Sequence, residues 1–306
     1  MPSSRWIEAK LARELEKSGT TVHRLSCGDG WWIERFGRSA LISVRNESEV
    51  PELVSELLSR GSEWDWMPRR VFCRLLVREP GQTDIPFLMD GYAGCNEESP
   101  NETVLESGLQ YEIDFSASYS PGLFPDQRAN RYFLRTRRPF RVLNTFSYTC
   151  AFSVAAAWEG AETTSVDISK SSLQRGRRNF ELNNLATAKH RFVPEDVPTY
   201  LARLRRRGEK FDAIILDPPT FGRGGAGKTF RVERDFDTLL EAAIDLSCPG
   251  SAILLSTNFT GWSERDLIGL ARNILPRDAT FHCEPAPPDF FGDSPSSTLW
   301  AILPAS

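Results

Sequence analysis

From Arg141 onward the sequence alternates between short apolar runs typical of buried strands and longer stretches with helical spacing. Strands that alternate with helices form a mostly parallel sheet through right-handed crossovers, with helices on both faces. The pattern predicts an α/β, doubly wound sheet whose last two strands form an antiparallel hairpin at one edge. The expected strands are 141–146, 163–167, 190–193, 211–216, 252–257, 279–283 and 299–303, and the expected helices are 151–158, 169–184, 197–207, 232–246 and 263–274.

The first part of the chain has a mixed pattern of short helices and alternating strands. We expect helices at 7–17 and 49–58, two or three strands within 21–44, further strands at 71–77 and 110–115, and a polar, loop-like tract at 80–100. A chain of 306 residues has room for two domains. We therefore predict a smaller N-terminal mixed α/β domain over residues 1–115, which could recognise a substrate, and a second domain over 116–306.

Composition excludes several classes of protein. Apolar residues make up 40% and charged residues 25% of the chain, which is ordinary for a soluble globular protein. No stretch has the pattern of a signal peptide or a membrane span, so a cytoplasmic location is expected. Six scattered cysteines without a Cys-x-x-Cys pair, and three histidines, predict no metal site and no disulfide framework. The net charge of −4 gives no overall attraction to nucleic acid, although a local basic patch would be sufficient.

The fourth strand of this pattern ends in an unusual sequence, Asp217-Pro218-Pro219-Thr220-Phe221, which a glycine-rich stretch follows. Ligands of open α/β sheets bind at this carboxyl edge of the strands. The prolines fix φ and remove amide donors, so the Asp217 carboxylate and the Pro218 carbonyl can accept hydrogen bonds from an amine or a ring nitrogen. Phe221 offers a face on which a base can stack. The alternative is a plain strand end followed by a polyproline turn.

A second candidate for ligand binding is the turn 144–151, which joins the first strand of the pattern to its helix. Backbone amides at a helix start suit a nucleotide-like ligand, but the Gly-x-Gly-x-x-Gly fingerprint of dinucleotide sites is absent. Asp167 ends the second strand, where an acid typically accepts hydrogen bonds from ribose hydroxyls. Asp196 follows the third strand and could accept from an adenine amino group. Acids at successive strand ends favour S-adenosylmethionine over a dinucleotide, although either acid alone is equally well explained as a helix N-cap.

Several segments resemble the bacterial large-subunit rRNA methyltransferases, which are class I, S-adenosylmethionine-dependent enzymes. The family includes the cytosine-5 methyltransferase I and the guanine-N7 half of the bifunctional methyltransferase K/L. The resemblance is strong over residues 108–259 and implies a seven-stranded, Rossmann-like methyltransferase sheet. The similar segments are 108–114, 119–131, 143–149, 166–169 and 217–221.

Position by position, the resemblance implies a role for each part of the site. It implies that methyl transfer takes place at Asp217, Pro218, Pro219 and Phe221. It implies that S-adenosylmethionine is bound by Phe124, Gln127, Arg128, Asn144, Phe146, Ser147, Tyr148, Thr149, Asp167, Ile168, Asp196 and Asp217. Without the flanking similarity, Asp126-Gln127-Arg128 would be interpreted as a polar helix start.

The sequence departs from the family pattern at three places. The family's glycine after Ser-Tyr-Thr is Cys150 here, which puts a side chain near the expected amino-acid end of the cofactor. Cytosine-5 members carry a nucleophilic cysteine after the fifth strand, whereas this chain has Ser256-Thr257-Asn258-Phe259 there and Cys248 before that strand. A nitrogen rather than cytosine C5 is therefore the expected acceptor. The family's small N-terminal RNA-binding (PUA) barrel is expected to be missing.

Three functions remain open at this stage. The first hypothesis is methyl transfer from S-adenosylmethionine to a ring or exocyclic nitrogen of a nucleic-acid base in large-subunit rRNA. RNA would then be the partner, with Arg223 and Lys228 as phosphate contacts beside the site. The second is methylation of a small molecule or a protein, which the acidic net charge favours. The third is a non-catalytic S-adenosylmethionine-binding module, which Cys150 favours.

Overall fold

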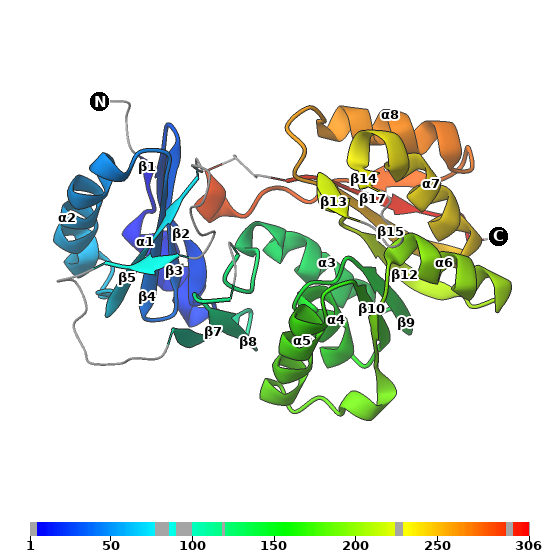
Figure 1. Ribbon diagram of the computed structural model, residues 1–306, viewed down its shortest axis with the longest axis horizontal. Coiled ribbons are helices and arrows are strands. Elements are labelled where there is room, and N and C mark those ends of the chain that lie inside the picture. The colour runs from blue at the N-terminus through cyan, green and yellow to red at the C-terminus, as the bar shows by residue number, and fades with distance from the viewer. Residues whose placement is uncertain are drawn as a thin grey trace. The chain divides into compact units, whose positions relative to one another are not determined.

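The computed structural model describes residues 5–76, 86–89, 100–117, 120–223, 229–291 and 296–305, without the side chains of Arg223 and Thr229. It divides into two compact units, traced in Figure 1. The N-terminal unit comprises Met1–Pro125 and Pro288–Phe291, and the C-terminal unit comprises Asp126–Pro287 and Gly292–Ser306. The sequence pattern placed the boundary earlier, between residues 115 and 116, and it did not anticipate that a short segment returns to the first unit.

The N-terminal unit is a mixed α/β structure, as expected. Its sheet, within the described residues, has six strands in the order β1-β2-β3-β4-β5-β6, and β7 pairs separately with β8. The pair β4–β5 is parallel and α2 connects these strands, whereas the other neighbouring strands are antiparallel. The elements are β1 (Arg5–Trp6), α1 (Ala9–Lys17), β2 (Val22–Gly28), β3 (Trp31–Phe36), β4 (Ser39–Val44), η1 (Glu47–Glu49), α2 (Val50–Arg60), η2 (Gly61–Glu63), β5 (Arg70–Leu75), β6 (Phe87–Leu88), β7 (Asn101–Glu106), β8 (Leu109–Asp114) and η3 (Pro125–Gln127).

One face of this N-terminal sheet forms an apolar core with α2. Leu25, Ile33 and Ile42 from three neighbouring strands pack with Leu53 and Leu57 of α2. The two leucines are four residues apart, so they lie on the same side of the helix. The strand β7 was not expected, because its mostly polar sequence lacks the alternation that predicts a half-buried strand.

The return segment 288–291 joins the N-terminal unit through polar and aromatic contacts with β2. The backbone N–H of Arg24 donates to Asp289 Oδ2 at 2.9 Å. The guanidinium carbon of Arg24 lies 4.2 Å from the centre of the Phe290 ring. Asp289 and Phe290 are fully buried. These contacts explain why a connection between two strands of the other sheet belongs to this unit.

The C-terminal unit confirms the doubly wound, mostly parallel, seven-stranded sheet. Its strands, among the described residues, follow the order β11-β10-β9-β12-β15-β17-β16. Neighbouring strands are parallel along β11-β10-β9-β12-β15, and β17 is antiparallel to both of its neighbours, which leaves β16 at the edge. The elements are α3 (Arg128–Arg137), β9 (Arg141–Thr145), α4 (Ala151–Trp158), β10 (Glu162–Asp167), α5 (Lys170–Leu182), η4 (Thr187–Lys189), β11 (Arg191–Pro194), α6 (Val197–Arg206), β12 (Phe211–Leu216), β13 (Phe221–Arg223), β14 (Thr229–Arg231), α7 (Val232–Asp245), β15 (Ser247–Thr257), α8 (Glu264–Ile274), β16 (Thr280–His282) and β17 (Ser297–Ile302). Between β16 and β17 the chain forms η6 (Pro288–Phe290), which belongs to the N-terminal unit.

Helices cover both faces of this sheet. Successive residues of a strand point to opposite faces, and β12 shows the consequence. Ala213 and Ile215 pack in one core with side chains of α3 and α4, whereas Ile214 and Leu216 pack in another core with side chains of α6, α7 and α8. Within the described ranges, none of the helices is both long and apolar enough to cross a membrane.

The strand order places a crevice at the carboxyl ends of β9 and β12. From β9 the chain continues to β10 on one side, and it later adds β12 on the other side. Thr145, the last residue of β9, lies opposite Val166 of β10 and Leu216 of β12. Asp167 and Asp217 follow these two residues directly. This is the topological switch point at which open α/β sheets bind their ligands.

Candidate active site

The loop between β9 and α4 has a constrained backbone. Phe146, Tyr148 and Cys150 have φ angles of 51°, 45° and 61°, in the left-handed region that L-residues seldom adopt. The Ser147 N–H donates to the Val166 carbonyl at 3.0 Å, and the Cys150 N–H donates to the Ser147 carbonyl at 2.7 Å. Such unfavourable conformations persist where surrounding contacts fix them, and they cluster at ligand sites.

Asp167 holds this loop and is no helix cap. Its Oδ2 accepts from the Tyr148 N–H at 2.8 Å, and its Oδ1 accepts from the Ser169 N–H at 2.8 Å. Ser169 is the N-cap of α5, because its hydroxyl accepts from the Ser172 N–H at 3.1 Å. Burial raises the pKa of Asp167, and the two backbone donors oppose that rise. The N-cap interpretation was therefore wrong for Asp167.

Asp196, in contrast, has the capping role that its sequence position allowed. It is the N-cap of α6, and its Oδ2 accepts from the Thr199 N–H at 3.3 Å and from the Thr199 hydroxyl at 2.8 Å. Asp196 follows β11, which pairs with β10 next to Asp167. Its contact with an adenine stays a prediction.

Three of the predicted cofactor residues in and before the loop are buried. Asn144 is 2%, Ser147 7% and Thr149 1% exposed. Asn144 Nδ2 donates to the Ser153 hydroxyl at 2.9 Å, and the Thr149 carbonyl accepts from Asn179 Nδ2 at 2.9 Å. These contacts show a supporting role for Asn144 and Thr149. Direct binding of the cofactor by these residues stays a prediction.

Other predicted members of the cofactor half are more open. Phe146 and Tyr148 are half-buried, and Ile168 is 57% exposed. Ile168 directly follows Asp167, so an apolar side chain lies at the strand end beside the carboxylate. An exposed aliphatic side chain at this place can cover the face of a planar ring, which agrees with the predicted cofactor role of Ile168.

The Cys150 side chain lies inside the fold. It is fully buried and packs against Gly176 of α5, where an added Cβ would lie 2.4 Å from the Cys150 sulfur. Burial raises the pKa of the Cys150 thiol to about 12. The sulfur thus occupies space that the missing side chain of Gly176 leaves open, so the cysteine does not obstruct the surface of the loop.

On the other side of the crevice, Asp217 is half-buried directly after β12. Burial raises the pKa of this carboxyl group, whereas a hydrogen bond from Ser256 and the charge of Arg131 lower it. The side chain of Pro218 is buried and that of Pro219 is exposed. The sequence analysis did not select Ser256 or Arg131. Ser256 lies at the end of the neighbouring strand, and Arg131 ends the segment that resembles the family.

Another side-chain contact ties the Asp-Pro-Pro-Thr-Phe segment to the end of β15. The Thr220 hydroxyl donates to Asn258 Oδ1 at 2.6 Å. The Thr220 carbonyl accepts from the Val232 N–H at 3.2 Å, which joins the segment to the start of α7. The segment is therefore held from two neighbouring elements.

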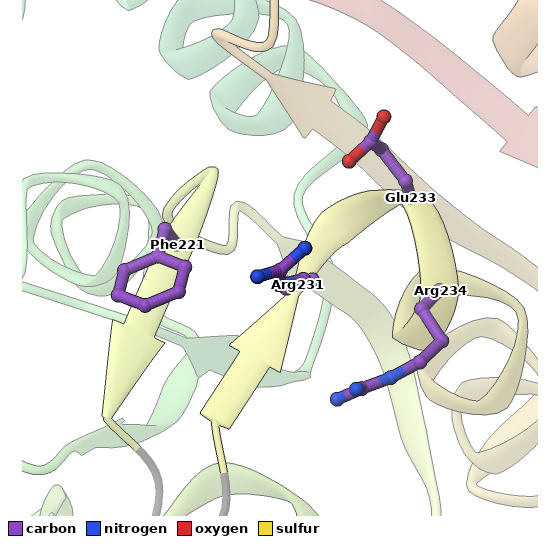
Figure 2. Close-up of a pocket in the computed structure, with 4 residues that line it drawn as sticks. All are labelled: Phe221, Arg231, Glu233 and Arg234. Carbon is purple, nitrogen blue, oxygen red and sulfur yellow. The ribbon is translucent and has the colours of Figure 1, made fainter.

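Phe221 lines a pocket of about 700 Å³ together with Arg231, Glu233 and Arg234. Figure 2 shows the Phe221 and Arg231 side chains facing each other from the two strands of the β13–β14 hairpin. The ring is 60% exposed, and the guanidinium carbon of Arg231 lies 5.9 Å from its centre. Arg234 donates to both oxygens of Asp235 at 2.7 and 2.8 Å.

The charged residues of this pocket were missed by the sequence analysis. Their position becomes evident only in the structure, where the pairing of β14 with β13 brings Arg231 opposite Phe221. The expected phosphate contacts were Arg223 and Lys228 instead. The side chain of Arg223 and all of Lys228 lie outside the described residues, so both contacts stay predictions.

The predicted cofactor residues before α3 differ in their surroundings. Gln127 is buried, and its Nε2 donates to the Ser256 hydroxyl at 3.2 Å. Arg128, the first residue of α3, is also buried. Phe124 belongs to the N-terminal unit and is 47% exposed. The roles of Phe124 and Arg128 in enclosing a cofactor stay predictions.

The residues at the ends of β9 and β10 fit S-adenosylmethionine. A carboxylate has about four lone-pair positions, and two backbone N–H groups are bonded to Asp167. Acceptor positions therefore remain for the two hydroxyls of a ribose. The neighbouring Ile168 is suited to an adenine. Among the described residues, no group of three or more His, Cys, Asp or Glu side chains could hold a metal ion.

Comparisons with known proteins show the family of the chain. Residues 92–304 match the family described as S-adenosylmethionine-dependent methyltransferase. The chain is 36% identical over 265 residues to ribosomal RNA large subunit methyltransferase I of Aeromonas salmonicida, a match that covers 83% of this chain and 64% of that protein. It is 38% identical over 162 residues to ribosomal RNA large subunit methyltransferase K/L of a Psychrobacter species, covering 51% of this chain and 20% of that protein.

A solved structure described as a methyltransferase complexed with SAH has a TM-score of 0.80 and 26% identity, covering 96% of this chain and 80% of that chain. The present chain spans less than two thirds of the length of either curated relative. The matched family nevertheless covers more than half of the chain and includes both halves of the crevice. The chain belongs to the S-adenosylmethionine-dependent methyltransferases.

Proposed function

We propose that this chain transfers the methyl group of S-adenosylmethionine to a nitrogen of an RNA base, in large-subunit rRNA. The observation that carries the proposal is the position of the segment Asp217 to Phe221. It starts at the carboxyl end of β12 beside the crevice and ends in an exposed aromatic ring that lines a pocket. A hydrogen-bond acceptor and a stacking surface therefore adjoin the cofactor half of the site.

The residues of the cofactor half would hold S-adenosylmethionine by its nucleoside. Asp167 would accept from the ribose hydroxyls, and Ile168 would cover the adenine. When bound, S-adenosylmethionine supplies a methyl group on a positively charged sulfur, which is already activated for displacement. The protein therefore needs to align the acceptor more than it needs to activate it.

Asp217 would align the acceptor nitrogen and receive its proton. Its carboxylate accepts the N–H of the acceptor, which keeps the nitrogen lone pair directed at the methyl carbon. As the nitrogen–carbon bond forms, the carbon–sulfur bond breaks and its electron pair stays on sulfur. The nitrogen then carries one proton too many, and the Asp217 carboxylate takes it. The pKa of Asp217, raised by burial, makes the carboxylate a better proton acceptor.

The described cysteines do not support transfer to cytosine C5. That reaction needs a thiolate that adds to the base, and β15 ends in Ser256 and Thr257. Cys248 lies at the other end of β15. Cys150 is nearer the crevice, but its thiol is fully buried with a pKa of about 12.

The pocket beside Phe221 supports a nucleic-acid base as the acceptor. The exposed ring can stack on a base, and the guanidinium of Arg231 beside it can contact the base or a phosphate. A paired base would have to leave its stack to reach Asp217. The names of the two relatives, both rRNA large subunit methyltransferases, support rRNA as the source of that base.

The test is methylation of rRNA by the purified protein. Large-subunit rRNA from cells that lack the gene is incubated with tritiated S-adenosylmethionine, and its nucleosides are analysed by mass spectrometry. We expect label in one N-methylated nucleoside, and at least about 100-fold slower labelling with the Asp217→Asn variant. Label in 5-methylcytidine would overturn the choice of nitrogen. Label confined to protein or to a metabolite fraction would overturn the choice of RNA.

A further inference from the structure

A chain of hydrogen bonds leads from the core of the C-terminal unit to Asp217. Trp300 Nε1 donates to Asn130 Oδ1 at 2.8 Å, and Asn130 Nδ2 donates to Gln127 Oε1 at 3.0 Å. Gln127 Nε2 donates to the Ser256 hydroxyl at 3.2 Å. Leu255 of β15 lies opposite Leu216 of β12, so Ser256 and Asp217, the next residues, lie side by side, and a hydrogen bond from Ser256 lowers the pKa of Asp217.

Chemistry fixes the direction of this chain. The indole nitrogen of Trp300 can donate but cannot accept, so the amide oxygen of Asn130 must face it. The Asn130 amide nitrogen then faces the oxygen of Gln127, whose own amide nitrogen is left to donate to Ser256. A hydroxyl has a single proton. Since the Ser256 oxygen already accepts from Gln127, its proton is directed to Asp217.

The residues of this hydrogen-bonded chain are buried. Trp300 and Ser256 are fully buried, and Asn130 and Gln127 are each 3% exposed. A hydrogen bond is stronger in such surroundings than in water, and neighbouring bonds in a chain polarise one another. The four residues come from η3, α3, β15 and β17, so packed elements hold every link. Asn130 is anchored further, because its Nδ2 also lies 3.2 Å from the Thr298 hydroxyl.

We propose that Gln127 and Ser256 are positioning residues that fix the Asp217 carboxylate for methyl transfer, with Asn130 and Trp300 as the rigid end of the chain. The proposal rests on the proposed function for the role of Asp217. It gives Gln127 a task that differs from enclosing the cofactor. Arg131 of α3 is the charged group that acts on Asp217 among the described residues, and it favours the same ionised form.

The test is a titration of the Asp217 carboxyl group by carbon-13 NMR, with the signal assigned by its loss in Asp217→Asn. A hydrogen bond to the ionised form of a carboxyl group lowers its pKa, so loss of that bond raises the pKa. We therefore expect Ser256→Ala to raise the pKa of Asp217 by about one unit or more. Gln127→Leu should raise it less, because the Ser256 hydroxyl remains but loses its fixed direction.

Two further variants make the titration specific. Ser256→Thr keeps the hydroxyl and should restore the wild-type pKa. Ser251→Ala removes another buried serine hydroxyl of β15, one whose hydrogen bond goes to the Cys248 carbonyl, and it should leave the pKa unchanged. A pKa of Asp217 that moves equally in Ser251→Ala and Gln127→Leu, or that does not move in Ser256→Ala, would overturn the proposal.

Activity gives the second readout. The acid limb of the pH–kcat profile should move to higher pH with the NMR value, because Asp217 must be ionised to accept the acceptor's N–H. The titration itself needs no acceptor molecule. If the pKa responds as expected but rRNA is not methylated, the proposed acceptor is wrong and the positioning chain stands. If rRNA is methylated but the pKa does not respond, the positioning chain alone is wrong.

Discussion

The two halves of the crevice are built in different ways. The cofactor half, at β9 and β10, consists of backbone in left-handed conformations that Asp167 and buried side chains hold in place. The transfer half, from the end of β12 to the end of β15, presents an exposed Phe221 ring and a carboxylate that a hydrogen bond from Ser256 and the charge of Arg131 stabilise. The cofactor half thus depends on the conformation of its backbone, whereas the transfer half depends on side chains, one exposed and one half-buried.

This difference follows from what each half must bind. The nucleoside of a cofactor is the same in every reaction cycle, so a fixed backbone can be shaped to it. An acceptor must enter and leave in every cycle. It is selected by side chains, and these can be substituted without a change in the backbone that binds the cofactor. Substitutions in the transfer half should therefore alter turnover alone, and substitutions in the cofactor half should alter affinity and stability together.

The largest expected effect is that of Asp217→Asn in the transfer half. We expect kcat to fall by about 10²–10⁴-fold, because the amide cannot take the proton that the acceptor nitrogen loses. The dissociation constant of S-adenosylmethionine should stay within about twofold, since the strand β9 lies between Asp217 and Asp167. Single-turnover methylation and calorimetric titration measure the two quantities. Turnover that survives would make the segment after β12 structural.

The sequence was sufficient for most of the C-terminal unit. The strands and helices that were expected came within a few residues of the observed ones, because apolar runs and helical spacing are local signals. The helix α3 and the strands β13 and β14 were not expected. Asp167 and Asp217 were found because strand ends can be recognised without a structure. The hydrogen-bond partners of these two carboxylates could not be found in this way, since Tyr148 and Ser256 belong to other elements.

The features that the sequence did not reveal depend on distant contacts. The burial of Cys150 depends on Gly176 of α5, and the helix α4 and the strand β10 lie between these two residues in the sequence. The pocket depends on a hairpin that brings Arg231 to Phe221. The return of the segment 288–291 depends on Arg24. Neither composition nor periodicity carries information about such pairs.

The next largest effect is expected for Gly176→Ala in the cofactor half. The added Cβ would meet the Cys150 sulfur at 2.4 Å and the Cys150 Cβ at 3.0 Å. Overpacking of this kind lowers the free energy of unfolding by about 1–3 kcal/mol. Denaturant titration of the variant measures the loss, which should exceed any gain from the better helix propensity of alanine.

Cys150→Gly is the matched second substitution. In that background the new methyl group meets no sulfur, so Gly176→Ala should become neutral or should stabilise by up to about 1 kcal/mol through helix propensity. The double-mutant cycle should therefore show strong coupling between the two sites. Additive effects would mean that Cys150 and Gly176 are not packed together. They would also weaken the view that the cofactor half is fixed from inside the fold.

The smallest effect is expected for Asp167→Ala. It removes the acceptor that we assign to the ribose hydroxyls, and the dissociation constant of S-adenosylmethionine should rise about tenfold, or about 1.4 kcal/mol. It also removes the acceptor of the Tyr148 and Ser169 N–H groups, so the melting temperature should fall at the same time. Calorimetric titration and thermal unfolding separate the two losses.

Asp212→Ala is the matched control for that experiment. Asp212 is another half-buried carboxylate of the same sheet, and its Oδ2 accepts from the Arg141 N–H at 2.7 Å. It lies near the start of β12, at the opposite edge from the crevice. Its loss should lower stability without changing cofactor affinity. If both variants lose stability but neither loses affinity, Asp167 only holds the loop, and the cofactor half binds its ligand through the backbone alone.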